Sequence, residues 1–118
     1  MRILITGSRM WVNREAIAAE LSSAIVGVSA PVVVHGGCPT GADAIADRLA
    51  RLYGCAVEVY EADWDQHGRA AGPVRNQKMV DLGADVCLAF PLGDSRGTRD
   101  CMRRAFAAGI PVREVADA

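Results

Sequence analysis

The chain has 118 residues, of which 51% are hydrophobic, so it is long enough for one domain with a real core and too short for two. Its 13 basic and 14 acidic side chains give a formal net charge of -1, which excludes a strong overall field for nucleic acid or an anionic membrane. No apolar run approaches the roughly 18 residues of a membrane span, and residues 1–5 lead into a turn rather than a cleavable signal. We therefore expect a cytoplasmic protein with no membrane partner, in which any anion site is local.

Strand-like and helix-like patterns alternate along the first half of the chain. Short apolar, β-branched runs indicate strands, and apolar residues that recur at helical spacing indicate helices, the first of them after the capping candidate Asn13. In chain order the pattern predicts a strand at 3–6, a helix over 17–25, a strand at 31–35, a helix over 42–52 and a strand at 56–60.

The second half begins with a long polar loop and then continues the alternation. Pro73 suits the first turn of the helix that follows the loop. The predicted elements are a loop at 63–72, a helix over 73–83, a strand at 85–90, a helix over 98–108 and an edge strand at 111–115. Several of the strands are apolar throughout, which favours a parallel sheet that is covered on both faces.

The predicted fold is therefore an α/β, Rossmann-like three-layer sandwich with a mainly parallel five-stranded sheet, formed by a single domain over residues 1–118. In such sheets a ligand binds beyond the carboxyl ends of the strands, where the strand order reverses, commonly between the first and fourth strands. The loops after the first four strands should open on that edge.

Three of these loops place glycines and small hydroxyl residues at strand-to-helix turns. Free backbone N–H groups and the helix dipole favour an anion such as phosphate at such turns. Glycine is also what any tight turn needs, and Thr40 with Asp43 fits a plain capping box equally well. The sequence lacks both the P-loop lysine and the Gly-x-Gly-x-x-Gly turn of ordinary nucleotide-binding enzymes. The candidate ligand-binding residues of these loops are Gly7, Ser8, Arg9, Gly36, Gly37, Gly41, Asp43, Ser95, Arg96, Gly97 and Thr98.

Two arginines, Arg75 and Arg99, fall in the first turns of predicted helices, where a positive charge opposes the helix dipole. Each could be solvated, or Arg99 could pair with a neighbouring aspartate. With Arg9 and Arg96 on the same edge, an anionic ligand held by arginines is the better explanation, which adds Arg75 to the candidate site.

The 63–72 segment is long for such a connection, and its glycines Gly68 and Gly72 would let it move as a lid. Trp64 could stack on a base or close the edge of the core. His35 could touch the ligand or bind a backbone group. The acidic residues and the histidine of the loop are too commonly solvated to indicate a metal, and the four cysteines lack zinc spacing, so we predict thiols, no metal site and no cofactor.

Taken together, these motifs resemble the SLOG superfamily of Rossmann-like domains, which bind nucleotides and nucleotide-derived ligands, and more closely its YspA-type branch related to YpsA. The resemblance covers essentially the whole chain and adds Asn76 to the expected ligand-binding residues. The segments that carry it are residues 5–9, 34–37, 41–43, 62–64, 72–77 and 95–98.

Within that superfamily, the LOG-type phosphoribohydrolases cleave the base from a nucleoside monophosphate with a Pro-Gly-Gly-x-Gly-Thr-x-x-Glu motif and an arginine. Pro91 and the pair Gly97-Thr98 resemble the ends of the motif, and Arg75 resembles the arginine. The position of the catalytic glutamate falls on Cys101, which leaves Asp100 as the candidate catalytic carboxylate nearby.

Three functions follow from the motifs and the resemblance. The first is a sensor-like binder of a nucleotide-derived, phosphate-bearing small molecule. The second is a hydrolase of a nucleotide N-glycosidic bond that uses Asp100. The third is a DNA-binding accessory protein, since the superfamily includes a DNA-recombination mediator, and the balanced charge argues against it. The resemblance also implies a homodimer, because relatives pair through helices, and Val74, Met79 and Val80 would leave apolar helix surface incompletely covered.

Overall fold

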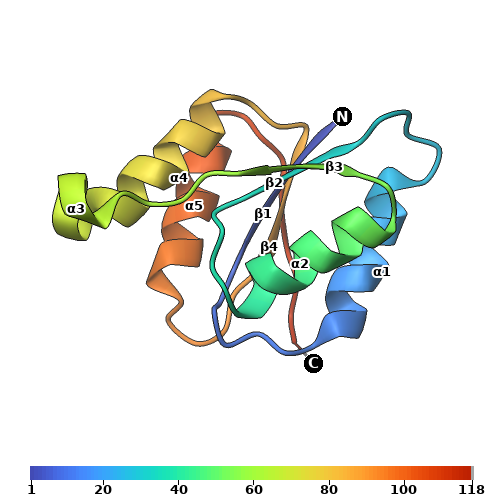
Figure 1. Cartoon of the computed structure of the whole chain (residues 1–118), viewed down its shortest axis with the longest axis horizontal. Helices are drawn as coiled ribbons and strands as arrows, with labels where there is room; N and C mark the ends of the chain where they lie inside the picture. Colours follow the sequence, from blue (N-terminus) through green and yellow to red (C-terminus); the bar gives the residue numbers. More distant parts are fainter. Residues whose placement is uncertain (118) are drawn as a thin grey trace.

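Five parallel strands form one sheet in the order β3-β2-β1-β4-β5 (Figure 1). This computed structural model describes residues 1–117. The strands are β1 (Arg2–Gly7), β2 (Val32–His35), β3 (Ala56–Val59), β4 (Val86–Phe90) and β5 (Val112–Glu114). The chain builds outward from β1 to β3 and returns to place β4 on the other side of β1, so the strand order reverses between β1 and β4. The predicted α/β fold is confirmed, and every strand pairing is parallel.

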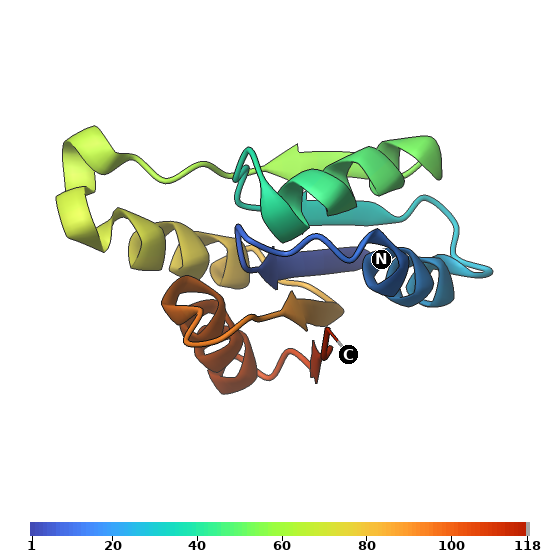
Figure 2. The same ribbon diagram turned by 90° about the horizontal axis from the view of Figure 1, so that it is seen from below.

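Two layers of helices cover the sheet (Figure 2). The long helices are α1 (Arg14–Ile25), α2 (Gly41–Leu52), α4 (Ala71–Asp81) and α5 (Arg96–Ala107). Side chains alternate along a strand, so Ile3 and Ile5 of β1 pack in a cluster with α1 and α2, whereas Leu4 packs in a second cluster with α4 and α5. The apolar strand runs of the sequence are buried for this reason, and the carboxyl ends of β1 and β4 remain open between the layers.

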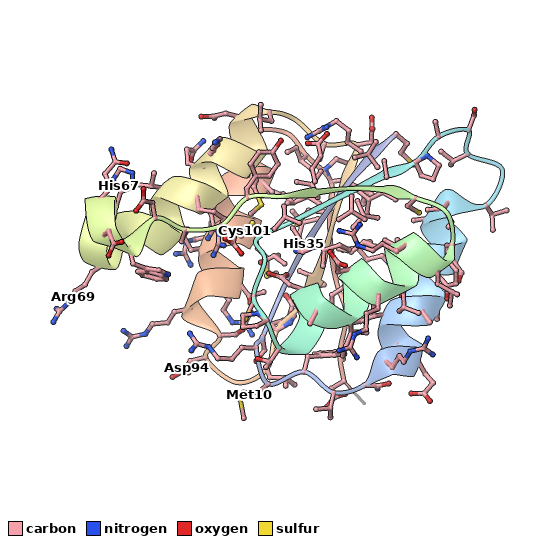
Figure 3. The ribbon with its side chains drawn as sticks, viewed as in Figure 1. Met10, His35, His67, Arg69, Asp94 and Cys101 are labelled. Atoms are coloured by element: carbon pink, nitrogen blue, oxygen red, sulfur yellow. The ribbon has the colours of Figure 1, made fainter. Side chains whose placement is uncertain are left out.

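The prediction that residues 63–72 form a polar loop is wrong. It folds as a short helix, α3 (Trp64–His67), a 3₁₀ turn, η1 (Gly68–Ala70), and the first residues of α4. The Asp63 carboxylate starts α3 by accepting the N–H of Gln66 at 3.1 Å. Gly72 lies inside α4 and cannot serve as a hinge. Figure 3 places His67 and Arg69 of this segment at one end of the molecule, away from Met10 and Asp94.

The outer surface of α4 is less apolar than the sequence suggests. Met79 and Val80 are 2% and 3% exposed because they belong to the core cluster beneath α4, whereas Val74 is 44% exposed. The expectation that Met79 and Val80 would be incompletely covered is therefore wrong. Among the described residues, no helix has the length and hydrophobicity needed to cross a membrane.

Candidate ligand-binding site

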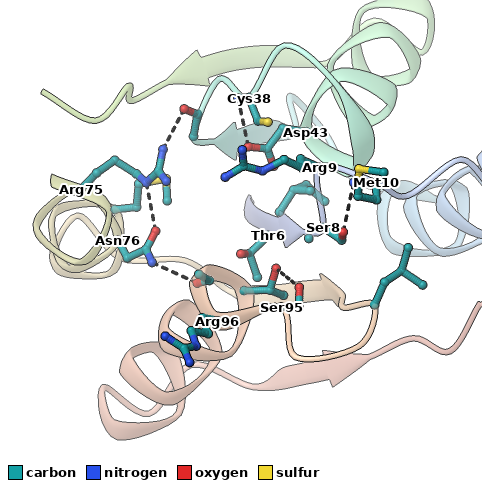
Figure 4. Close-up of a pocket in the computed structure, with 17 residues that line it drawn as sticks. Thr6, Ser8, Arg9, Met10, Cys38, Asp43, Arg75, Asn76, Ser95 and Arg96 are labelled. Carbon is teal, nitrogen blue, oxygen red and sulfur yellow. Dashed lines mark hydrogen bonds between the residues drawn. The ribbon is translucent and has the colours of Figure 1, made fainter. Parts of the chain in front are cut away.

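A cleft of about 420 Å³ lies beyond the carboxyl ends of β1 and β4, between the loops that follow β1, β2 and β4 and the side of α4 (Figure 4). The cleft brings together most of the residues selected from the sequence, namely Gly7, Ser8, Arg9, Gly36, Asp43, Arg75, Asn76, Ser95, Arg96, Gly97 and Thr98. The selected residues that do not line it are His35, Gly37, Gly41, Trp64 and Asp100. The lining also includes Thr6, Met10 and Cys38, which the sequence analysis missed.

The start of α5 forms one wall of this cleft. The loop before it turns through Ser95, which has a left-handed φ of 44°, and the Ser95 hydroxyl donates to the Thr98 hydroxyl at 2.9 Å. The first N–H of α5 to bond within the helix is that of Arg99, which donates to the Ser95 carbonyl at 3.0 Å. The N–H groups of Arg96, Gly97 and Thr98 precede that bond and have no backbone acceptor in the described part of the chain. They provide the donors and the positive helix end that an anion requires.

Arg75 holds the opposite wall through hydrogen bonds to backbone and side chain. Its Nη1 donates to the carbonyl oxygens of Gly36 at 2.8 Å and Tyr60 at 3.4 Å, and its Nε donates to Asn76 Oδ1 at 2.9 Å. The guanidinium lies so close to Gly36 that a side chain there would displace it from this position. α4 begins at Ala71, so Arg75 lies in its second turn, and the argument that its charge opposes the helix start is wrong.

The other arginines divide into two groups. Arg99 lies outside the cleft and pairs with Glu114 at 3.7 Å, rather than with a neighbouring aspartate. Arg9 and Arg96 line the cleft, and neither forms an ion pair within residues 1–117. Figure 4 shows Arg9 and Arg75 approaching the opening from different sides. The cleft therefore offers cationic side chains in addition to the amides of α5.

Asp43 is the one carboxylate among the described residues that line the cleft. It lies in the first turn of α2 and is only 8% exposed. Its Oδ2 accepts the N–H of Cys38 at 3.3 Å, whereas its Oδ1 is buried with no hydrogen-bond partner. Burial raises the pKa of Asp43, and the hydrogen bond from the Cys38 N–H and the positive charge of Arg75 oppose that rise. The expected capping box does not form, because the Thr40 hydroxyl donates to the Arg9 carbonyl and makes no helix cap.

His35 stabilises the loop after β2 from outside the cleft. Its Nδ1 accepts the N–H of Gly37 at 3.0 Å, which leaves Nε2 to donate to Asp47 Oδ2 at 2.7 Å. Both ring nitrogens are occupied, so the imidazole has no free atom for a ligand. Of the two interpretations of His35 from the sequence, the structure shows the backbone-binding one.

Asp100 lies on the side of α5 that faces α4, where polar neighbours hold its carboxylate. Its carboxylate accepts Asn76 Nδ2 at 3.0 Å and Arg104 Nε at 2.8 Å, and Arg103 lies 3.6 Å away. Burial would raise the pKa of Asp100, but the hydrogen bonds from Arg104 and Asn76 outweigh it and hold the pKa below its usual value. Cys101, at the position of the catalytic glutamate in the LOG-type motif, is fully buried.

Two further residues selected from the sequence have packing roles that the structure makes visible. Gly41 has a φ of 75°, and a side chain there would overlap the backbone of Ser8 and Arg9, so glycine lets the loop after β1 lie against the start of α2. Trp64 is 61% exposed on α3 and does not reach the cleft. Within the described residues, no group of three or more histidine, cysteine or acidic side chains could hold a metal ion.

Comparisons with known proteins identify the family of the chain. Residues 1–67 match the model of the YspA, cpYpsA-related SLOG family. The chain is also 54% identical over 125 residues to the "Gene 61 protein" of Mycobacterium phage D29, with 98% of this chain and 97% of that protein covered. The chain belongs to the YspA, cpYpsA-related SLOG family.

The match to the SLOG family model includes the loops after β1 and β2, and thus Arg9, Gly36 and Asp43, but ends before Arg75 and the start of α5. Among solved structures, the C-terminal domain of a hydrogenase from Pyrococcus furiosus aligns with a TM-score of 0.46 and 17% identity, covering 97% of this chain and 90% of that domain.

Proposed function

We propose that this SLOG protein binds a nucleotide or nucleotide-derived small molecule through its phosphate, in the cleft beyond β1 and β4, and acts as a sensor of that ligand. The observation that carries the proposal is the start of α5, where the N–H groups of Arg96, Gly97 and Thr98 open on a cleft that also holds Arg9 and Arg75. Backbone donors and arginines together favour a dianionic phosphate more than either does alone.

Binding without hydrolysis fits the carboxylates better than catalysis does. Cleavage of an N-glycosidic bond needs a carboxylate placed against the sugar. Asp100, the candidate for that role, does not line the cleft and is occupied by Asn76 and Arg104. We therefore expect no release of free base when nucleoside monophosphates are incubated with the protein, and release at an enzymatic rate would contradict the sensor proposal.

A binding experiment with a matched pair of variants tests the phosphate site. Inorganic phosphate, ribose 5-phosphate and the four nucleoside monophosphates are titrated against the protein while its unfolding temperature is followed. A ligand at 100 times its dissociation constant adds about 2.7 kcal/mol to the free energy of unfolding. We expect Arg96→Ala to weaken these probes about tenfold, since it removes one charge-assisted bond.

The control is Arg103→Ala, because Arg103 lies on the same helix but outside the cleft. It should leave the affinity unchanged. Equal effects of the two variants, or no stabilisation by any of the probes, would overturn the proposed phosphate site.

We also propose that two copies of the chain pair through the outer surface of α4. The side chains of Pro73, Val74 and Leu82 contribute apolar surface to a shallow hollow there, beside the polar side chains of Gln77, Lys78, Asp81 and Arg104, and Val74 and Leu82 are 44% and 49% exposed. Burial of such a surface favours association. Sedimentation should show a dimer that Val74→Asp converts to a monomer, and a monomeric wild-type protein at micromolar concentration would contradict this pairing.

A further inference from the structure

Asp43 combines three properties that its surroundings in the protein do not explain. The side chain lines the cleft, is only 8% exposed, and has a buried Oδ1 atom with no hydrogen-bond partner among the described residues. A buried polar atom without a partner is costly and uncommon in folded proteins. A donor from a bound ligand would satisfy this atom.

The local structure gives Asp43 no sufficient structural role. It does not cap α2 in a capping box with Thr40, and its one hydrogen bond, from the N–H of Cys38, is long at 3.3 Å. The nearby charge of Arg75 favours the ionised carboxylate, but Arg75 donates its own hydrogen bonds to Gly36, Tyr60 and Asn76. The charge of Arg75 favours the ionised form of Asp43, and an ionised carboxylate only accepts, so the partner that fits its free oxygen is a hydrogen-bond donor.

The charge pattern of the cleft indicates which part of a ligand supplies that donor. Arg9, Arg75 and the amides of α5 offer donors and suit the oxygens of a phosphate, whereas Asp43 is the single carboxylate of the lining. We propose that Asp43 accepts a hydrogen bond from a sugar hydroxyl of the bound ligand and so selects a ribose phosphate over its deoxyribose counterpart. This inference rests on the proposed function, since it requires the phosphate to bind at the start of α5.

Only a small movement is needed to bring the carboxylate to the ligand. The last side-chain bond of aspartate rotates over a broad range. A partial turn about it would move the unpartnered oxygen towards the wall of the cleft that the Asp43 side chain already lines, at the expense of the long hydrogen bond from the Cys38 N–H. The start of α2 itself stays fixed, because Gly41 lies against the backbone of Ser8 and Arg9.

The test compares probes that differ by one hydroxyl. Calorimetric titrations use ribose 5-phosphate and 2-deoxyribose 5-phosphate, and then adenosine monophosphate with its 2′-deoxy and 3′-deoxy forms. In the wild-type protein we expect the loss of at least one hydroxyl to weaken binding about tenfold or more, as for a hydrogen bond to a charged group. Ribose 5-phosphate carries no base, so its discrimination separates a sugar hydroxyl from a base N–H as the donor.

Three variants test which residue is responsible for the discrimination between ribose and deoxyribose probes. Asp43→Asn keeps the shape of the side chain and should reduce the ratio between ribose and deoxyribose probes to near one, while inorganic phosphate binds at least as tightly as to the wild type because a negative charge has left the cleft. Asp43→Ala should do the same and excludes a residual acceptor. Asp65→Asn, an exposed carboxylate on α3 outside the cleft, should keep the wild-type ratio.

The outcomes distinguish this inference from the proposed function. If phosphate and nucleotides bind but the wild type does not discriminate, or if the Asp43 variants discriminate as the wild type does, the hydroxyl contact is overturned and the phosphate site stands. If Asp65→Asn also loses the ratio, the effect does not belong to Asp43 and the inference again fails. If none of the probes binds, the proposed function fails and this inference fails with it.

Discussion

Asp43 and Asp47 lie one turn apart on the same helix, yet their carboxylates have opposite surroundings. Asp47 accepts Arg51 Nε and His35 Nε2, each at 2.7 Å, and these contacts, that of Arg51 first, hold its pKa below the usual value. Asp43 accepts a single backbone N–H, leaves one oxygen without a partner, and has its pKa raised by burial.

Asp47 therefore stabilises the fold through its contacts, whereas Asp43 does not. Through His35, Asp47 is linked to the backbone of Gly37 and so holds the loop after β2. Asp43 provides no comparable link, although it occupies the wall of the cleft. Residues that are locally unfavourable and lie in a cleft are often functional, so the difference favours a ligand-binding role for Asp43.

The largest expected effect on stability comes from removing the side chain of Arg75, whose positive charge lies near Asp43. Arg75→Ala deletes charge-assisted hydrogen bonds to Gly36 and Asn76 and leaves part-buried acceptors unpaired, so we expect the free energy of unfolding to fall by about 3 kcal/mol. Phosphate-bearing probes should bind more weakly as well. Denaturant unfolding and calorimetry measure the two effects on one purified variant.

Arg9→Ala is the matched control for Arg75. Arg9 is an exposed arginine of the same cleft whose side chain makes no ion pair within residues 1–117, so its loss should weaken phosphate binding and leave stability unchanged. Unchanged stability in Arg75→Ala would show that the hydrogen bonds of Arg75 do not hold the cleft wall.

The second-largest effect is expected when the carboxylate of Asp47 is neutralised. Asp47→Asn replaces the charge that pairs with His35, so we expect the free energy of unfolding at neutral pH to fall by about 2 kcal/mol. Asp94→Asn, on the exposed loop before α5, should change it by less than about 0.5 kcal/mol. If the two variants unfold alike, the His35–Asp47 pair does not support the loop after β2.

The sequence could predict the frame of this site but not the distinction between the two aspartates. Strand and helix periodicity located the sheet, and the topology rule placed the loops of Gly7, Gly36 and Gly97 at one cleft. Hydrogen-bond satisfaction depends on distant groups, such as His35 for Asp47, so spacing along α2 cannot reveal it. The same limit applies to Arg75, whose acceptors Gly36 and Tyr60 belong to other elements.

A local helix cap explains why residues 63–72 fold as helix although their hydrophobic periodicity predicts a loop. Residues 63–72 contain few apolar residues at regular spacing, so they predict a loop, yet Asp63 caps α3 and the chain runs on through η1 into α4. The signal was present as an aspartate three residues before Gln66, which is a helix-start pattern.

The third-largest effect is expected when the buried carboxylate of Asp43 is neutralised. Asp43→Asn removes a buried charge and keeps an acceptor for the Cys38 N–H, so the unliganded variant should be as stable as the wild type or more stable by about 1 kcal/mol at neutral pH. Denaturant unfolding without ligand provides the measurement. A loss of more than about 1 kcal/mol would make Asp43 a structural residue and remove the contrast with Asp47.

The smallest expected effect is the pH dependence of the wild type itself, because the two carboxylates act in opposite directions. The folded pKa of Asp47 lies below 3.8, so its stabilisation is present above that pH and is lost as the pH falls through the folded pKa. The folded pKa of Asp43 lies above 3.8, so its penalty is present above the folded pKa and disappears as the pH falls towards 3.8. From neutral pH to about pH 3, the deficit of Asp47→Asn and any surplus of Asp43→Asn should therefore both shrink, and the two stability curves should converge on the wild type from opposite sides. Differences that stay constant across this range would show that neither carboxylate changes its pKa on folding.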